Sequence, residues 1–192
     1  MFRMENQVKT FCLLLFVAFA LLSINAQAAE EKAHSAGLMI GQAWPSGEIG
    51  KDVDGNVAPG IFYEYAASDV FSLYTNYLYS THTNSKLTLG SSDLGIKANL
   101  VNYDKLSPYA FLGMGLYFVN KRIGAANEIA SATLFGFNLG TGADLDLSDR
   151  FYIGMFFTFH NMFAKTLTLP IAGNTELSGR WAGIFLRGGV RF

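Results

Sequence analysis

The sequence predicts an all-β protein, an eight-stranded antiparallel up-and-down transmembrane β-barrel that follows a cleaved signal peptide. Three observations support this prediction. The chain begins with the features of an export signal. Segments rich in aromatic and β-branched residues then recur at regular spacing, separated by polar or glycine-containing breaks. Within these segments an apolar face alternates with a face of glycine and charged residues, as in strands that separate two different surroundings.

The export signal occupies the start of the chain. Arg3 and Lys9 make it basic, residues 11–22 form an uncharged apolar core, and an Ala-Gln-Ala cleavage pattern ends at Ala28. The core is shorter than the roughly 20 residues of a spanning helix, which disfavours the alternative of an N-terminal anchor helix. We therefore expect a signal peptide over residues 1–28 and a single barrel domain over residues 29–192.

Composition narrows the class of the exported domain. Aromatic and charged residues each make up 15% of the chain, and its formal net charge is -1. The one cysteine, Cys12, lies in the signal core, so no disulfide is expected to hold the exported domain. No later segment stays apolar for the roughly 18 residues of a spanning helix, which leaves the closed barrel as the membrane form. The absence of a basic patch argues against a nucleic-acid partner.

The expected strands and connections follow one another regularly. The strands are expected at residues 36–44, 58–66, 70–80, 88–100, 108–120, 132–146, 150–163 and 181–192. The long polar connections are residues 45–57, 81–87, 121–131 and 164–180; residues 67–69 and 147–149 are tight turns, and 101–107 is intermediate. Long loops at one end and short turns at the other are the layout of outer-membrane barrels, with the long loops outside the cell.

The last strand shows the two faces. One face carries Ala182, Ile184, Leu186, Val190 and Phe192, and the other carries Arg187 and Arg191. Glycines on the other strands mostly share the face of the charged residues, and the crowded lumen of a small barrel needs small residues. We therefore expect the glycine and charge face to line the lumen and the apolar face to meet lipid. A soluble barrel that binds an apolar ligand has the same period and is the alternative.

Most polar side chains of the lumen face are expected in the half of the barrel toward the short turns. They are Glu64, Lys97, Asn99, Asp144, Arg187 and Arg191, and Asp93 is expected nearer the middle. Unpaired buried charge is very costly, so we expect ion pairs and hydrogen bonds among them. Our hypothesis is that Arg187 pairs with one of the three acids and closes the lower barrel to bulk flow. The alternative is the charged constriction of a selective pore.

Three segments then resemble a known family. SPYAFLGMGLYF (residues 107–118), GTGADLDLSDRFYIG (140–154) and GVRF (189–192) resemble strands and turns of the OmpW family and of the OmpA-like small outer-membrane barrels. The resemblance implies a bacterial outer-membrane protein that binds or passes small hydrophobic solutes. It also implies that Phe192 marks the terminal strand for the barrel assembly machinery. Outer-membrane lipid and lipopolysaccharide are the other expected partners. The loops outside the cell look shorter here than in that family.

A few residues are candidates for contacts with a ligand at the outer mouth. They are Tyr74, Leu78, Tyr117, Phe156, His160 and Trp181. The alternative function is a lipid-modifying enzyme, of the lipid A deacylase or acyltransferase type, that uses His160 as a base. In the deacylase family a serine follows the histidine by two residues on an outward face, whereas here Met162 stands at that place and His160 faces inward, so we assign no catalytic residue and do not expect an enzyme. The histidines lie far apart, and we expect neither a metal nor a cofactor.

Overall fold

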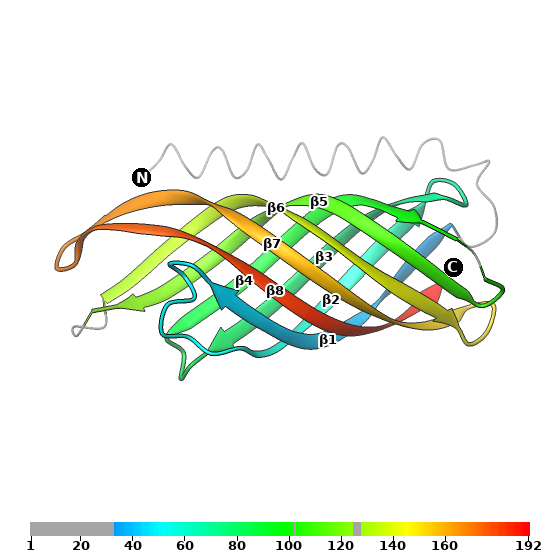
Figure 1. The fold of residues 1–192 in the computed structure, drawn as a ribbon, viewed down its shortest axis with the longest axis horizontal. Coiled ribbons are helices and arrows are strands. Elements are labelled where there is room, and N and C mark those ends of the chain that lie inside the picture. Colours follow the sequence, from blue (N-terminus) through cyan, green and yellow to red (C-terminus); the bar gives the residue numbers. More distant parts are fainter. Residues whose placement is uncertain (1–32, 102, 125–127) are drawn as a thin grey trace. The chain divides into compact units, whose positions relative to one another are not determined.

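Eight antiparallel strands form a closed barrel in the computed structural model (Figure 1). The structure describes residues 33–192, except 102 and 125–127, so the expected signal peptide lies outside the described residues. The strands are β1 (His34–Ser46), β2 (Asn56–Ala66), β3 (Phe71–His82), β4 (Leu87–Asn99), β5 (Leu106–Ile123), β6 (Glu128–Asp146), β7 (Phe151–Leu169) and β8 (Gly173–Arg191). Each strand pairs with its neighbours in sequence, and β8 returns to β1, so the predicted up-and-down topology is confirmed. Within the described part of the chain, no helix is long and apolar enough to cross a membrane.

Two of the predicted connections are wrong. Residues 164–180 were expected to form a loop, but they extend β7 and β8, which pair as far as Leu169 and Gly173. Residues 121–131 likewise hold the ends of β5 and β6, which pair as far as Ile123 and Glu128. Threonine and leucine alternate along this part of β7. Threonine favours strands, but its hydroxyl made the segment look like a polar loop in the sequence. The two hairpins therefore extend well beyond the other strands (Figure 1).

The short turns at the other end are built alike. In the β2–β3 turn the hydroxyl of Ser68 accepts a hydrogen bond from the backbone N–H of Phe71 at 3.0 Å. In the β6–β7 turn the hydroxyl of Ser148 accepts one from the backbone N–H of Phe151 at 3.1 Å. The Ser-Asp pairs of the sequence therefore fold the two tight turns that were predicted, because serine competes for backbone donors at such positions.

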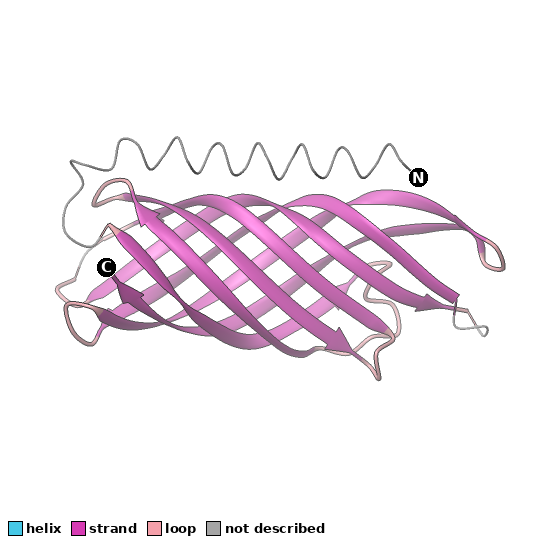
Figure 2. Cartoon of the chain, turned by 180° about the vertical axis from the view of Figure 1, so that it is seen from behind, coloured by secondary structure: helices cyan, strands magenta, loops and turns pink. Residues whose placement is uncertain are grey.

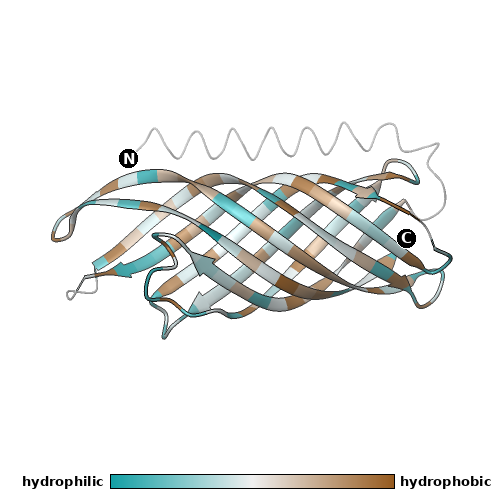
Figure 3. Ribbon diagram, in the orientation of Figure 1, coloured by the Kyte–Doolittle hydropathy of each residue, from teal (hydrophilic) through white to brown (hydrophobic). Residues whose placement is uncertain are grey.

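The faces of the strands are as predicted. On β8, Trp181, Phe185 and Arg187 are buried, whereas Ile184 and Leu186 are exposed by 47% and 61%. The same alternation runs around the barrel, so hydrophilic and hydrophobic segments are interleaved along each strand (Figure 3). The strands lie oblique to the barrel axis (Figure 2), the tilt that closure requires. The exposed apolar side chains form the outer surface of the wall.

The barrel closes at the last residue of the chain. The backbone N–H of Phe192 donates to the carbonyl of His34 at 2.8 Å, and the N–H of His34 donates back at 3.1 Å. Their rings stack with centroids 6.0 Å apart, and the Nδ1 atom of His34 lies 2.6 Å from the hydroxyl of Tyr63. The terminal phenylalanine is therefore part of the seam between β1 and β8.

Candidate functional site

A layer of four charges crosses the lumen near the short-turn end. This charge layer consists of Glu64 on β2, Lys97 on β4, Asp144 on β6 and Arg187 on β8, each at most 7% exposed. Every second strand contributes one member, because inward side chains of alternate strands meet at one height in a small barrel. Two basic and two acidic groups face one another, so the layer carries no formal net charge.

Each member of the charge layer touches both groups of opposite sign. The ammonium of Lys97 lies 2.7 Å from Glu64 Oε2 and 3.3 Å from Asp144 Oδ2. Arg187 donates from Nε to Asp144 Oδ1 at 2.8 Å, and its two terminal nitrogens contact Glu64 and Asp144. Glu64 and Asp144 are two of the three acids expected for Arg187. Such mutual pairing is what allows charges to remain buried.

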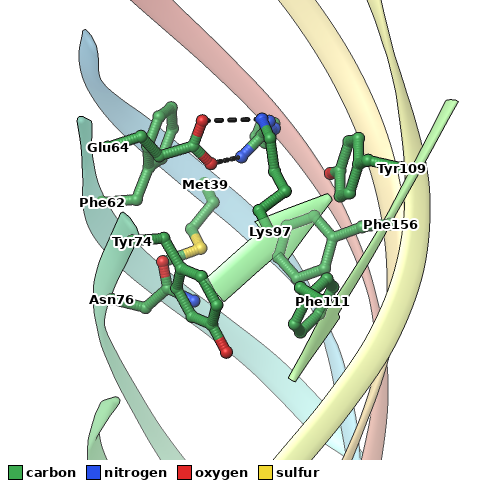
Figure 4. A pocket seen from close by; sticks show the side chains of 10 residues that line it. Met39, Phe62, Glu64, Tyr74, Asn76, Lys97, Tyr109, Phe111 and Phe156 are labelled. Atoms are coloured by element: carbon green, nitrogen blue, oxygen red, sulfur yellow. Dashed lines mark hydrogen bonds and ion pairs between the residues drawn. The ribbon is translucent and has the colours of Figure 1, made fainter. Parts of the chain in front are cut away.

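Aromatic rings enclose the charge layer. The guanidinium carbon of Arg187 lies 4.8 Å from the ring centroid of Tyr109 and 5.0 Å from that of Phe62. Lys97 Nζ lies 4.6 Å from the Tyr109 centroid, in the range of cation–π contacts. Figure 4 shows Glu64 and Tyr109 on opposite sides, with Lys97 between them. The cavity beside them has a volume of about 20 Å³, which is room for about one water molecule.

Two of the predicted lumen residues lie at the rim and not in this layer. Asn99 donates from its amide to the carbonyl of Asp69 at 3.0 Å. Arg191 lies 2.7 Å from Asp146, and the side chains of this pair are 26% and 29% exposed. Asn99 and Arg191 both line a cavity of about 100 Å³ at the short-turn end, which we call the vestibule. The charge layer forms the inner end of the vestibule, because Glu64, Lys97 and Asp144 also line it.

A second polar layer lies above the first. Asp93 accepts hydrogen bonds from Ser91 and from the amide of Asn138, both at 3.1 Å. The hydroxyl of Tyr74 donates to Asn138 Oδ1 at 2.5 Å. The hydroxyl of Tyr117 lies 3.0 Å from His160 Nδ1. Asp93 is therefore held by neutral donors. The pairing of Asp93 with Arg187, which was one of the three pairings expected from the sequence, does not form.

The indole ring of Trp181 covers this polar layer. It stacks on His160 with centroids 3.8 Å apart and an interplanar angle of 10°. The other ring nitrogen of His160 lies 2.9 Å from the hydroxyl of Thr158. His160 is only 2% exposed, and its two ring nitrogens face Tyr117 and Thr158. No serine hydroxyl is placed against it in the contacts of the described residues. Those residues also contain no group of three or more side chains able to hold a metal ion.

The side chains predicted at the outer mouth are therefore enclosed. Each of them is at most 5% exposed: Tyr74, Leu78, Tyr117, Phe156, His160 and Trp181. Their inward direction is as predicted, but their depth is not. The hairpins extend the wall above them, and a loop covers them from the outer side. A ligand at an open mouth would not reach them in this structure.

That covering loop joins β1 to β2 and folds inward. Ile49 at its centre is fully buried, and its backbone N–H donates to the carbonyl of Ser178 at 3.0 Å. The ammonium of Lys121 contacts the carbonyl of Glu48, and Nδ1 of His82 lies 2.9 Å from the carbonyl of Asp54. The signal for this docking was the pair of apolar residues Ile49 and Val53 within a polar stretch, which sequence reasoning passed over; Val53 packs against the same core. Ile49 belongs to the same hydrophobic core as Leu87, Leu89, Val119 and Leu177.

Above this loop the barrel is hollow. A cavity of about 620 Å³, which we call the outer cup, lies among the β1–β2 loop, the β3–β4 turn, β5 and β8. Its charged lining residues are Glu48, Lys51, Asp52, Lys86, Lys121, Arg122 and Glu176. Three successive layers of side chains cross the lumen below the charged cup: the charge layer, the polar layer with Trp181, and the apolar floor around Ile49.

Several solved structures of outer-membrane proteins share the fold of this chain. Neisserial surface protein A is 14% identical, with a TM-score of 0.64, covering 83% of this chain and 97% of its own. The N-terminal barrel domain of OprF from Pseudomonas aeruginosa is 13% identical, with a TM-score of 0.59, and the match covers 85% of this chain and 100% of that domain. OprG from the same organism is 13% identical, with a TM-score of 0.55, and the match covers 84% of this chain and 97% of OprG.

These similarities show the shared fold. No curated protein matches the sequence. The model of the outer membrane protein beta-barrel domain matches residues 14–180, which is most of the chain. The resemblance to small outer-membrane barrels is confirmed at the level of the family. The exposed apolar side chains on the outer surface of the wall are those that meet lipid. The chain belongs to the outer membrane protein beta-barrel domain family and is a bacterial outer-membrane protein.

Proposed function

We propose that this outer-membrane protein is a closed, structural barrel that does not conduct ions or solutes through its lumen. The observation that carries the proposal is the charge layer of Glu64, Lys97, Asp144 and Arg187, buried and paired in both directions. An ion that passed it would have to break at least one of these pairs in a surrounding of low polarity, which is very costly. Small barrels whose lumen is filled by side chains commonly lack a channel.

Passage of small hydrophobic solutes through the lumen is less well supported. A solute would have to displace Ile49, then Trp181, and then cross the charge layer. The cavity between the last two has a volume of only about 20 Å³. Ligand pockets for small molecules have volumes of about 300–1,000 Å³. The role of the six enclosed mouth residues in solute contact therefore stays a prediction.

The proposal also assigns no reaction to His160. Its ring is stacked on Trp181 and bonded on both nitrogens, so it has the surroundings of a packed core side chain. A general base must be within reach of the proton that it takes from the substrate. The enclosed position of His160 supports a structural role.

The outer surface supports the expected membrane partners. Leu38, Leu112 and Leu186 are each at least 61% exposed on the outer wall, and such side chains would be stable only against lipid tails. We propose that lipopolysaccharide surrounds the extended hairpins, and that Phe192 is presented to the barrel assembly machinery before the β1–β8 seam closes.

Conductance in planar lipid bilayers tests the closed state. We expect the folded protein to give no stable current steps, while a large porin recorded under the same conditions gives them. A gel in which the unheated protein migrates differently from the boiled protein establishes that the sample is folded. Reproducible current steps from the folded protein, at a size that scales with salt concentration, would overturn the proposal.

A further inference from the structure

The outer cup is a large space that solvent can enter, and its lining carries both signs of charge. Four basic and three acidic side chains line its volume of about 620 Å³. We propose that the cup binds a small zwitterionic group, a phosphate ester that carries an ammonium, of the phosphoethanolamine type. This goes beyond the closed barrel proposed above, because it assigns a ligand to the space outside the sealed lumen.

The basic side of the cup is built by the β3–β4 turn and β5. Lys86 and Arg122 are neighbours, because the backbone N–H of Arg122 donates to the carbonyl of Lys86 at 2.8 Å. Lys121 precedes Arg122, is 9% exposed, and contacts the carbonyl of Glu48 with its ammonium. An ammonium has three N–H donors, so one backbone carbonyl leaves donors of Lys121 for a ligand. The fork of an arginine fits a carboxylate and a phosphate alike, and the two added lysines match the larger charge and the third acceptor oxygen of a phosphate.

The acidic residues of the cup are Glu48 and Asp52 of the β1–β2 loop, which also carries Lys51, and Glu176 of β8. The bond from the N–H of Ile49 to the carbonyl of Ser178 places Glu48 of the loop beside β8. Glu176 lies on β8 in the same lining and accepts a hydrogen bond from the hydroxyl of Ser178 at 2.9 Å. Carboxylates at this side would repel a simple anion, but they favour the ammonium of a zwitterion.

The ion pair within the cup, between Lys86 and Asp52, leaves the basic and acidic groups of the cup available to a ligand. Lys86 and Asp52 lie 3.7 Å apart, but their side chains are 38% and 74% exposed, so solvent screens the pair strongly. A ligand phosphate can compete for Lys86 at little cost. The volume of the cup lies within the range of pockets for small molecules. Size, accessibility and mixed charge therefore agree on a polar zwitterion and not on an apolar solute.

Titration of the isotope-labelled barrel by NMR tests the site. The protein is kept in a non-ionic sugar detergent, because a phosphocholine detergent would occupy a zwitterion site. The probes are O-phosphoethanolamine, ethyl phosphate, which lacks the ammonium, and ethanolamine, which lacks the phosphate. Since each charged hydrogen bond adds to affinity, O-phosphoethanolamine should bind at least about tenfold more tightly than either half. The amide signals of residues 121–122 and 175–177 should shift most.

Two variants separate the sides of the cup. Arg122→Gln should weaken both phosphate probes by a similar factor, about fivefold or more. Glu176→Gln should remove the preference for O-phosphoethanolamine over ethyl phosphate and leave ethyl phosphate bound at least as tightly. Arg180→Gln is the matched control, because Arg180 is exposed on β8 but does not line the cup. A heat-dependent gel shift establishes that each variant is folded.

The source of the group is decided in the same titration. Phosphatidylethanolamine added to the micelles competes with O-phosphoethanolamine if lipid headgroups reach the cup over its rim. It does not compete if the cup accepts a soluble compound from outside the cell, and either outcome supports the site. The proposal is overturned if the three probes bind within twofold of one another, or if Arg122→Gln and Arg180→Gln behave alike. These outcomes do not depend on whether the lumen conducts.

Discussion

Replacement of Arg187 by methionine is the most direct test of the charge layer. Arg187→Met keeps an unbranched side chain in the lumen but removes the guanidinium. Lys97 then remains as the only base beside Glu64 and Asp144, both of which are at least 94% buried. The layer changes from no formal net charge to one uncompensated negative charge.

The size of the effect follows from the contacts that are lost. Arg187 bonds to both carboxylates and lies within 5.4 Å of the ring centroids of Phe62, Tyr109 and Tyr152. Removal of one partner from a buried ion pair costs about 3–5 kcal/mol. We expect the free energy of unfolding to fall by that amount, which corresponds to roughly 10²–10³-fold or more in the folding equilibrium.

The assay is equilibrium unfolding by urea in lipid vesicles, followed by tryptophan fluorescence and by the heat-dependent gel shift. Arg191→Met is the matched control: its ion pair with Asp146 is partly exposed at the rim, so it should cost about 1 kcal/mol or less. Adding Glu64→Gln to Arg187→Met restores the charge balance and should recover about 1–3 kcal/mol of the loss. Equal stability of Arg187→Met and Arg191→Met, or no recovery in the double variant, would refute the reasoning.

Three further predictions concern packing in the lumen and the covering loop. A Cβ at Gly154 would collide with the carboxylate of Asp144, whereas a Cβ at Gly188 would meet nothing closer than 4.0 Å. Gly154→Ala should therefore lower the gel-shift temperature markedly, and Gly188→Ala should lower it only slightly. Tyr74→Phe removes a hydroxyl bonded at 2.5 Å and should cost about 1–2 kcal/mol in urea unfolding, whereas Tyr109→Phe removes a hydroxyl with no hydrogen-bond partner and should cost less than about 0.5 kcal/mol. Ile49→Asp should release the β1–β2 loop from its buried site, because an unpaired carboxylate is costly there, and trypsin should then cleave the loop in folded protein much faster.

Each of these three predictions has an outcome that contradicts it. Equal gel-shift temperatures for the two glycine variants would mean that the lumen yields at Gly154 without cost. A larger loss for Tyr109→Phe than for Tyr74→Phe would reverse the assignment of the buried hydrogen bond. An unchanged cleavage rate for Ile49→Asp, with Ile171→Asp at the exposed tip of the β7–β8 hairpin as the control, would show that Ile49 does not hold the loop.

Much of the barrel was predictable from local pattern. The number of strands, their order and the direction of each face follow from a two-residue alternation, because one side of every strand meets lipid and the other a crowded lumen. Arg187 could therefore be placed inside the barrel, and Leu186 outside it, from their positions in sequence. The tight turns at Ser68 and Ser148 were equally local, since a serine hydroxyl reaches a backbone donor three residues ahead.

Depth and pairing were decided only by the tertiary structure. Glu64 and Arg187 lie 123 residues apart, and they meet because the stagger between strands brings them to one height. The stagger is a property of the closed barrel and leaves no mark within any one strand. Asp93 has the same inward direction, but the stagger places it one layer higher, beside neutral donors. In the same way, an isoleucine in a polar loop could cover the lumen only once the extended hairpins had formed the walls around it. The sequence by itself therefore determined which side chains enter the barrel, and closure determined which of them meet.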